Sequence, residues 1–318
     1  MNSVSIIICT LNRAEHLRGT LEAIDQVNVP SDFSVEVIVV DNGSKDHTAT
    51  LVMEWNPRQV QKRYLVENRP GQCYARNTGV SISNCDLILF TDDDIRPPIY
   101  WLEMMCRPIV NGEADAIAGR ITIASHLERD WMTERHRSAL AIRDGQNLPA
   151  NLVGANMSFR RDVLLKVPFF DTELGPGALG FGDDSLFSRQ LFQAGFRVVV
   201  GSKETEVVHH FDQSRLSYES FVETAIRRGR SKAYVAYHWL HNEPNFVRSR
   251  FFYRWLMLKL RRIILKSKQN RDGIAINEYL LIQRLSFLRF LMEIGNQPRN
   301  YTKRGLVKLI QNDVLAAK

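Results

Sequence analysis

The 318-residue sequence predicts an α/β fold, with a mostly parallel sheet flanked by helices and a helical C-terminal extension. Three observations lead to this prediction. The first hundred residues alternate short β-branched runs with segments of helical spacing, a pattern typical of parallel sheets. Polar residues follow three of the strand-like runs, and ligands bind at the carboxyl ends of strands in such sheets. From about residue 216 the spacing is helical to the end.

The individual elements follow from the local pattern. A β-branched run predicts a strand at 4–10, and Leu17, Leu21 and Ile24 lie at the spacing of one helix face. In the same way we expect strands at 35–40, 61–66 and 86–90 and helices at 12–24, 48–55 and 74–83. Further along we expect strands at 116–123 and 155–159, an irregular charged stretch at 127–145, and a helix at 185–194 that ends at Gly195.

Composition limits the class of protein. The chain is 44% hydrophobic and 24% charged, which is ordinary for a globular protein. No stretch approaches the roughly 20 apolar residues of a transmembrane helix, and the run at 6–9 is too short for a signal-peptide core. The four cysteines show neither metal-site spacing nor the density of a disulfide framework, so we expect a reduced, cytoplasmic location.

Three consecutive carboxylates, Asp92, Asp93 and Asp94, follow the apolar run at 86–90. A strand interior could not bury three adjacent acids without partners, whereas at the end of a strand they project into a crevice. Alternation places Asp92 and Asp94 on one side of the chain and Asp93 on the other. Two oxygen donors on one side suit a hard divalent cation that also holds phosphate oxygens, and the alternative is an exposed acidic turn.

Several segments in a fixed order resemble a family 2 glycosyltransferase of the GT-A fold, of the bacterial type. They are Ser5–Arg13, Val39–Ser44, Ala75–Gly79, Thr91–Asp94, and then Gly182–Leu186 with Arg189, Gly195-Phe196, Val208-His209 and Arg215-Leu216. The resemblance covers residues 1–215. It implies a nucleotide-sugar-binding half at 1–98, an acceptor half at 99–215, and a separate helical extension at 216–318.

The resemblance implies a divalent-metal-dependent, inverting transfer of a sugar from a nucleotide-diphosphate donor, with UDP-sugars favoured. The residues implied to bind the donor are Thr10, Asn12, Arg13, Asp41, Asn42, Arg76, Asp92 and Asp93. Asp41 would accept a base N–H, and Arg76 would meet the diphosphate. Asn42 departs from the Asp-Asp-Gly-Ser form common in the family, which leaves uracil and thymine both open as the base. Without the resemblance, Arg76 would be taken for an ordinary surface arginine.

The same resemblance assigns the metal and the base. Asp94, Asp92 and His209 would hold Mn²⁺ or Mg²⁺, with a structural histidine as the alternative for His209. Asp184 would be the general base that takes the acceptor proton. Asp183, where the family usually has Glu, would bind or orient the acceptor. Acids at this position would also stabilise the first turn of a helix, so helix capping is the alternative for Asp184.

Two more residues are candidates for binding the acceptor. Asn156, on the strand expected at 155–159, would bind a sugar hydroxyl or serve as an ordinary strand-edge asparagine. Trp131, in an otherwise polar stretch, would stack on an acceptor sugar or be buried. The acceptor is expected to be a glycan or lipid-linked hydroxyl, in the synthesis of cell-surface polysaccharide.

The net charge of +7 is concentrated in one segment. Residues 226–268 hold 12 Lys and Arg against one acid, Glu243. Within them, an apolar stripe on one helix face is flanked by arginines; its members are Phe252, Leu256, Leu260 and Ile263, widened by Tyr253, Met257 and Ile264. Such a helix either lies on an anionic membrane surface, which would make the protein peripheral on the inner face of the cell membrane, or packs against its own core with a solvated basic rim.

Other functions fit the sequence less well. Nucleotidyl transfer onto a sugar phosphate would need a glycine-rich Arg-Lys signature after the first strand, and residues 10–13 lack it. A non-catalytic nucleotide-sugar-binding module would lack the metal acid or the base, and both are present. Clustered arginines without aromatic stacking motifs do not indicate nucleic acid.

Overall fold

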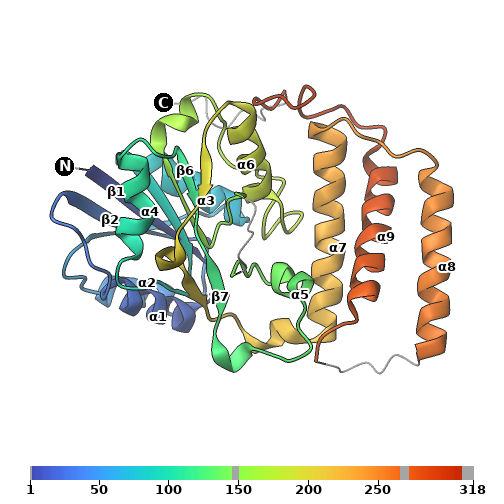
Figure 1. Ribbon diagram of the computed structural model, residues 1–318, viewed down its shortest axis with the longest axis horizontal. Helices are drawn as coiled ribbons and strands as arrows, with labels where there is room; N and C mark the ends of the chain where they lie inside the picture. The colour runs from blue at the N-terminus through green and yellow to red at the C-terminus, as the bar shows by residue number, and fades with distance from the viewer. Residues whose placement is uncertain (1, 145–149, 266–271, 310–318) are drawn as a thin grey trace. The chain divides into compact units, whose positions relative to one another are not determined.

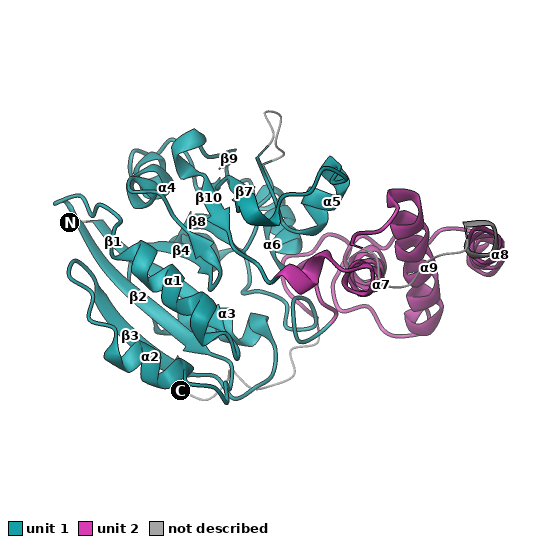
Figure 2. Cartoon of the chain, turned by 90° about the horizontal axis from the view of Figure 1, so that it is seen from below, with its two compact units in different colours: residues 1–178, 183–212 teal, residues 179–182, 213–318 magenta. Residues whose placement is uncertain are grey.

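A computed structural model of the chain describes residues 2–144, 150–265 and 272–309, with only the backbone of 262–265 (Figure 1). These residues divide into two compact units (Figure 2), one of residues 1–178 and 183–212, the other of 179–182 and 213–318. No helix of the described residues is long and apolar enough to cross a membrane.

The first unit is built on a large sheet that confirms the predicted α/β class. Its described strands, in spatial order, are β3 (Gln61–Val66), β2 (Phe33–Asp41), β1 (Asn2–Thr10), β4 (Leu87–Asp92), β8 (Asn156–Arg160), β6 (Ala116–Ala118) and β9 (Val198–Val200). Neighbouring strands run parallel except at β8, which is antiparallel to both β4 and β6.

The central strands are hydrophobic on both faces, because helices cover both sides of the sheet. The described α-helices of this unit are α1 (Ala14–Ile24), α2 (Thr48–Glu54), α3 (Gln72–Ile82), α4 (Trp101–Val110), α5 (Glu134–Ala139) and α6 (Asp183–Gln193). One core cluster joins alternate residues of β1, such as Ile7, with Val80 of α3 and Leu191 of α6. Ile6 and Ile8 point to the opposite face of the sheet and are equally buried, because alternate side chains of a strand face opposite ways.

The prediction of one continuous strand at 116–123 is wrong. The chain breaks after β6, and β7 (Ile121–Ile123) joins β5 (Ile95–Arg96) and β10 (Val207–His209) in a second, three-stranded sheet of the described chain. At the break Gly119 packs on the Asn156 amide so closely that a Cβ would lie 2.3 Å from Nδ2. The stretch expected to be irregular at 127–145 contains α5, whose first turn is closed by a capping box between Thr133 and His136.

The second unit is mainly helical, as the pattern after residue 216 predicts, but the prediction of helix to the end is wrong, because the described residues 295–309 form turns and irregular chain. It contains α7 (Tyr218–Tyr234), α8 (Val247–Leu265) and α9 (Ile276–Ile294). Helices α7 and α9 come very close at Gly229, where a Cβ would lie 2.4 Å from the backbone oxygen of Gln283. Helix α8 packs on α9.

All four cysteines are reduced and shielded. Cys9, Cys73 and Cys106 are buried, and Cys85 is partly buried. Burial raises the pKa of all four thiols, to about 12 for Cys9. They therefore remain protonated and unreactive at neutral pH.

Candidate active site

The carboxyl ends of β1, β2 and β4 bring their polar residues to one edge of the sheet. The strand register pairs Cys9 with Asp92 and Thr10 with Asp41. Because the three strands are parallel neighbours, the residues that follow them in sequence emerge together at this edge.

Asp93, which follows β4, is bound by side chains at the end of β1 and in the loop after it. It is buried, its Oδ2 accepts a 2.8 Å hydrogen bond from the Thr10 hydroxyl, and its Oδ1 lies 3.3 Å from Nη1 of Arg13. Burial, opposed by the nearby Arg13 and reinforced by Asp94, raises the pKa of Asp93 to about 7. The Asp93 backbone oxygen also accepts a 2.7 Å bond from Thr20, a residue that the sequence interpretation did not single out.

Asp94 lies between a cation and an imidazole. Its Oδ2 is 2.7 Å from Nη2 of Arg13, and its Oδ1 is 3.2 Å from Nε2 of His209. The second sheet produces this contact, because β10 pairs antiparallel with β5 so that His209 stands opposite Ile95, and the His210 N–H donates to the Asp94 backbone oxygen.

The arrangement of Asp94 and His209 fits a divalent cation. Adjacent ligand atoms of an octahedral ion with bonds of about 2.1 Å lie about 3 Å apart, close to the separation of Asp94 Oδ1 and His209 Nε2. Nδ1 of His209 is buried without a hydrogen-bond partner. Among the described residues no group of three or more His, Cys, Asp or Glu could hold a metal unaided. An ion here would therefore take the rest of its ligands from substrate phosphates and water, as Mg²⁺ commonly does.

The turn after β2 is tightly organised. Asp41 is buried and accepts 2.7 Å bonds from the Ser44 backbone N–H and from the Tyr64 hydroxyl. Asn12 joins the first loop to this turn, since its N–H donates to the Ser44 hydroxyl and its side-chain oxygen accepts from the Lys45 N–H. The two loops expected to bind the donor are thus bonded to each other.

Asn42 uses both ends of its amide. Nδ2 donates to the backbone oxygens of Glu67 (2.8 Å) and Arg69 (2.7 Å), while Oδ1 accepts from the Gly71 N–H (2.9 Å). A carboxylate could accept the third bond but could not donate the other two. This explains in physical terms why Asn stands here, and it assigns Asn42 a part in holding the loop that leads into α3.

Glu67, which sequence reasoning missed, fixes the same loop. Its carboxylate accepts from the Arg69 backbone N–H and guanidinium and from the Thr78 hydroxyl. The hydrogen bonds from Arg69, helped by the one from Thr78, lower the pKa of Glu67 to about 2 despite its burial. Its place directly after β3 was the available signal, because it extends the series of polar strand ends.

Arg76 is buried, with 4% of its surface exposed. Nη1 forms an ion pair with Asp183, and Nη2 lies 3.7 Å from Oδ1 of Asp92. The guanidinium also lies 5.8 and 5.6 Å from the rings of Phe90 and Phe170. The expected contact of Arg76 with a diphosphate stays a prediction, and in this structure its partners are carboxylates.

Asp183 and Asp184 open α6. Asp183 is buried against Arg76, whereas Asp184 is partly exposed and accepts from the Gly154 N–H (3.3 Å) and the Ser185 N–H (2.6 Å). Burial raises the pKa of Asp184, Asp183 raises it further, and Arg76 partly opposes both. Asp184 therefore both stabilises the first helical turn and holds a proton more strongly than an ordinary aspartate.

The two other acceptor candidates lie apart from this group of contacts. Asn156 is fully buried: its Oδ1 accepts from the Trp101 indole, and its Nδ2 donates to the backbone oxygens of Arg120 and Thr205. Its polar atoms are thus used inside the fold, and we leave it out of the acceptor pocket. Trp131 has its ring edge-on to His136, with centroids 5.2 Å apart, and its stacking on a sugar stays a prediction.

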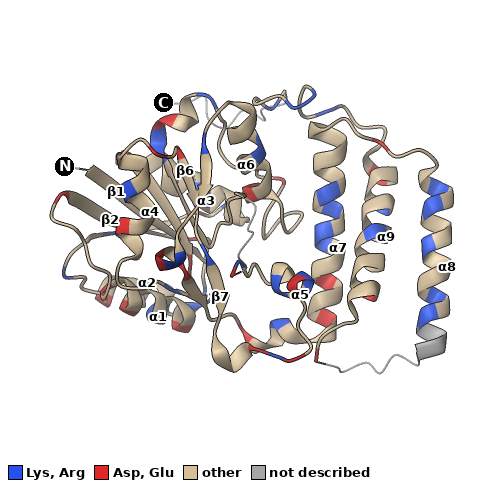
Figure 3. Cartoon of the chain, in the orientation of Figure 1, with Lys and Arg blue, Asp and Glu red and all other residues tan. Residues whose placement is uncertain are grey.

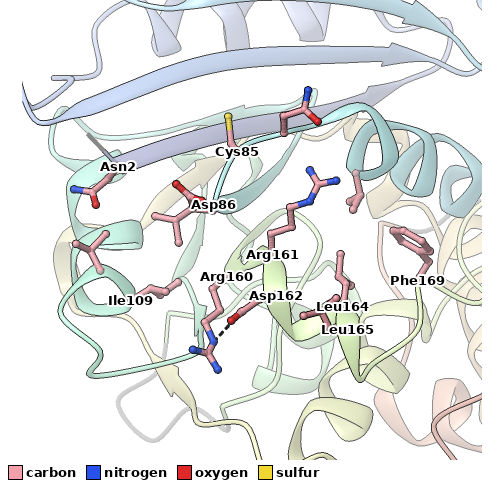
Figure 4. A pocket seen from close by; sticks show the side chains of 14 residues that line it. Asn2, Cys85, Asp86, Ile109, Arg160, Arg161, Asp162, Leu164, Leu165 and Phe169 are labelled. Atoms are coloured by element: carbon pink, nitrogen blue, oxygen red, sulfur yellow. Dashed lines mark ion pairs between the residues drawn. The ribbon is translucent and has the colours of Figure 1, made fainter.

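A separate cavity of about 670 Å³ lies at the opposite end of β1 and β4 (Figure 4). Its lining includes Asn2, Cys85, Arg160, Arg161 and Phe169. Asn2 begins β1, whereas Asp92 ends β4 and Asp93 follows it, so this cavity is not part of the candidate active site.

The sequences of several glycosyltransferases and glycan synthases match part of this chain. AglE, a glycosyltransferase of Haloferax volcanii, is 28% identical over 196 residues, which cover 61% of this chain and 62% of AglE. A glucosyl-dolichyl phosphate glucuronosyltransferase of the same organism is 21% identical over 72% of this chain and 76% of its own length. Chondroitin synthase of Pasteurella multocida is 24% identical over 62% of this chain, which matches only 24% of the synthase.

Solved structures show the same fold. The mannosyltransferase PcManGT from Pyrobaculum calidifontis superposes with a TM-score of 0.53 at 17% identity, over 92% of this chain and 70% of that one. The S. aureus TarS 1-349 structure with UDP gives 0.51 at 14% identity, over 94% and 93%. The fold is therefore of the GT-A type, as predicted. Since the family model for glycosyl transferase family 2 matches residues 5–167, about half of the sequence, the chain belongs to that family.

Proposed function

We propose that this protein is an inverting glycosyltransferase that moves a sugar from a nucleotide-diphosphate donor, with UDP-sugars favoured, to a hydroxyl of a glycan or lipid-linked acceptor. The observation that carries the proposal is that one arginine lies between a carboxylate of the donor side and a carboxylate of the acceptor side. Arg76 contacts both Asp92, at the end of β4, and Asp183, the neighbour of Asp184. Donor-side and acceptor-side carboxylates are thereby held in one folded unit.

The donor would lie along the polar strand ends. Asp41 keeps lone pairs free beside its two bonds and would accept a base N–H, with Thr10, Asn12 and Asn42 fixing the surrounding loops. Arg13 is paired with Asp93 and Asp94 but keeps 32% of its side chain exposed at this edge, and it would meet the diphosphate.

The acceptor side would supply the base. The acceptor hydroxyl attacks the anomeric carbon as the bond from that carbon to the diphosphate oxygen breaks, and its proton passes to Asp184. Burial keeps the pKa of Asp184 raised, which makes it a stronger base than an exposed aspartate. Asp94 and His209, with Asp92 beside them, would hold Mn²⁺ or Mg²⁺. When bound, that ion would stabilise the charge that develops on the leaving diphosphate.

The base is tested by Asp184→Asn, which keeps a side-chain oxygen for the Ser185 N–H but removes the proton acceptor. UDP binding measured by calorimetry should persist while turnover falls at least about 100-fold. The matched comparison is Asp183→Asn. Full activity of Asp184→Asn would contradict the proposal, and a dead Asp183→Asn beside it would move the role to the neighbour.

The metal is tested by UDP binding with Mn²⁺ and with EDTA. We expect EDTA to weaken UDP binding to the unaltered protein, and Asp94→Ala to abolish this difference, because the ion would link Asp94 to the diphosphate. Equal UDP affinity of the unaltered protein in the two conditions would rule out metal-dependent donor binding. A thermal-shift panel of UDP-, dTDP- and GDP-sugars with Mn²⁺ would identify the base.

The acceptor class rests on the named relatives. The relatives include a chondroitin synthase and a glucosyl-dolichyl phosphate glucuronosyltransferase, which act in glycan synthesis by their names. We therefore propose an acceptor in polysaccharide or lipid-linked glycan synthesis. Sugar-phosphate nucleotidyl transfer is the competing reaction, and it would release pyrophosphate where glycosyl transfer releases a nucleoside diphosphate.

We further propose that α8 attaches the protein to the inner face of the cell membrane. Phe252, Leu256 and Leu260 keep 62%, 43% and 45% of their surface exposed, so packing inside the chain does not account for this stripe. Arg250 and Arg254 flank it, and Figure 3 shows the basic residues along the length of α8. The side chains of Arg262, Ile263 and Ile264 and the residues Lys266 and Lys268, which belong to the same predicted surface, lie outside the described residues.

Membrane attachment is tested with vesicles of phosphatidylcholine, with and without phosphatidylglycerol. Each basic residue near an anionic surface contributes about 1 kcal/mol, so co-sedimentation should require phosphatidylglycerol and should be lost at 1 M salt, where the Debye length is about 3 Å. Arg254→Glu with Arg261→Glu should abolish it, while Arg289→Glu on α9 should not. Equal sedimentation with both vesicle types would refute attachment by charge.

A further inference from the structure

We propose that Arg76 is a positioning residue for the base Asp184, which it serves by holding Asp183, and that it is not a ligand of the donor diphosphate. The inference rests on the proposed function, because it takes Asp184 as the base. It differs from the role that the sequence alone implies for Arg76, a residue one turn into the helix that follows the glycine-containing loop.

The positive charge of Arg76 is already paired with carboxylates of this chain. One guanidinium nitrogen pairs with the buried Asp183, and the other lies 3.7 Å from Asp92. The rings of Phe90 and Phe170 lie near the guanidinium and keep water away. A diphosphate would have to enter a buried place between these carboxylates and rings, whereas Arg13, itself paired with Asp93 and Asp94, keeps 32% of its side chain exposed at the same edge.

Gly154 connects Arg76 to Asp184. A Cβ on Gly154 would lie 1.8 Å from Nη2 of Arg76, so only glycine lets the guanidinium occupy this place. The N–H of the same residue donates to Oδ2 of Asp184. The backbone at 154 therefore contacts both the buried cation and the base, and moving either group disturbs the other.

The charges around Asp184 show what Arg76 does. The groups that face the base are Asp183, from its own helix, and Arg76, from α3. Two further groups near Arg76, the thiols of Cys9 and Cys73, are uncharged at neutral pH because burial raises their pKa. Arg76 is thus the cation that balances Asp183. Without it a buried, unpaired carboxylate would stand next to the base and make Asp184 hold its proton to a higher pH.

The test replaces Arg76 by Met, which keeps the length of the side chain and removes its charge. UDP binding is followed by calorimetry with Mn²⁺, and turnover by UDP release from the nucleotide sugar that stabilises the protein most, with water as acceptor. We expect the UDP dissociation constant to change less than about threefold. The acidic limb of the pH–rate profile should move up by at least about one pH unit.

A second variant separates charge from structure. Asp183→Asn in the Arg76→Met background removes the unpaired carboxylate, so the acidic limb should return toward its original pH. Arg76→Lys keeps the charge but cannot bridge two carboxylates. This variant should lower kcat at least about 10-fold, with little change in the pH of the acidic limb of the pH–rate profile. It replaces Arg76→Met in the test if Arg76→Met does not fold.

Two results would overturn the inference. The first is UDP binding weakened at least about 10-fold in Arg76→Met or Arg76→Lys with an unmoved pH profile, because Arg76 would then be a ligand of the diphosphate. The second is an acidic limb that stays displaced in the double variant. Failure of the proposed function itself would look different, since Asp184→Asn would then remain active whatever Arg76 does.

Discussion

Glu67→Gln removes the charge that holds the loop between β3 and α3. The folded-state pKa of Glu67 is about 2, against an ordinary value of 4.5, because Arg69 and Thr78 donate to its carboxylate. At about 1.4 kcal/mol per pH unit, the difference of about 2.5 units corresponds to at most about 3.5 kcal/mol. The Arg69 side chain is 45% exposed, so solvent screens the pair and we expect a loss of about 1–2 kcal/mol at pH 7.

The pH dependence of this loss is specific. Since the pKa of Glu67 is lowered by folding, its stabilising contribution is complete above about pH 4.5 and disappears as the pH falls toward 2. Urea unfolding of the unaltered protein and Glu67→Gln should therefore differ most at pH 7 and less at pH 3.5. The control is the exposed Glu113→Gln, which should cost under about 0.5 kcal/mol at both pH values. A difference for Glu67→Gln that is the same at pH 7 and pH 3.5 would refute the electrostatic explanation.

Three further predictions concern the surroundings of the site. Asn42→Asp loses the two donors to Glu67 and Arg69, so thermal unfolding should show a loss of about 1–3 kcal/mol, and an unchanged melting temperature would contradict the assigned amide orientation. Asn156→Ala removes the hydrogen bonds to the Trp101 indole and to the Arg120 and Thr205 backbone oxygens, of which that of Arg120 keeps the bond from the Val207 N–H, and should cost about 2–4 kcal/mol in urea unfolding; a loss of activity at full stability would instead return Asn156 to the acceptor pocket. His209→Ala should raise the Mn²⁺ concentration for half-maximal UDP binding at least about 10-fold in calorimetry, and an unaltered Mn²⁺ requirement would remove His209 from the metal site.

The local sequence pattern was sufficient to predict most of the strands and helices in the first hundred residues. The strands of this region are continuous β-branched runs because helices bury both faces of a parallel sheet, and such runs are visible without any tertiary information. The break between β6 and β7 was not visible, because it depends on the approach of Gly119 to Asn156, 37 positions later. Helix α4 was also missed; it contains Pro108 and follows two prolines, which are poor signals for a helix.

The candidate site, like the fold, has features that the sequence predicts and features that only the folded chain shows. The strand-end acids could be identified because their chemistry conflicts with burial inside a strand. The family resemblance also grouped His209 with Asp94, and the pairing of β10 with β5 accounts for their contact. The pairing of Asp183 with Arg76, 107 positions away, could not be identified, because only the folded chain brings them together. Sequence motifs indicate which residues carry charge, whereas the fold decides which opposite charge each of them meets.

The shielded thiols have a practical consequence for studying the helical unit. Since burial raises the pKa of Cys9, Cys73, Cys85 and Cys106, maleimide reagents should react slowly with the unaltered chain at pH 7. A new cysteine at an exposed position of α8, such as Phe252→Cys, would then be the dominant labelling site without removal of the native cysteines. A polarity-sensitive dye at that position would report whether the helix enters a lipid surface.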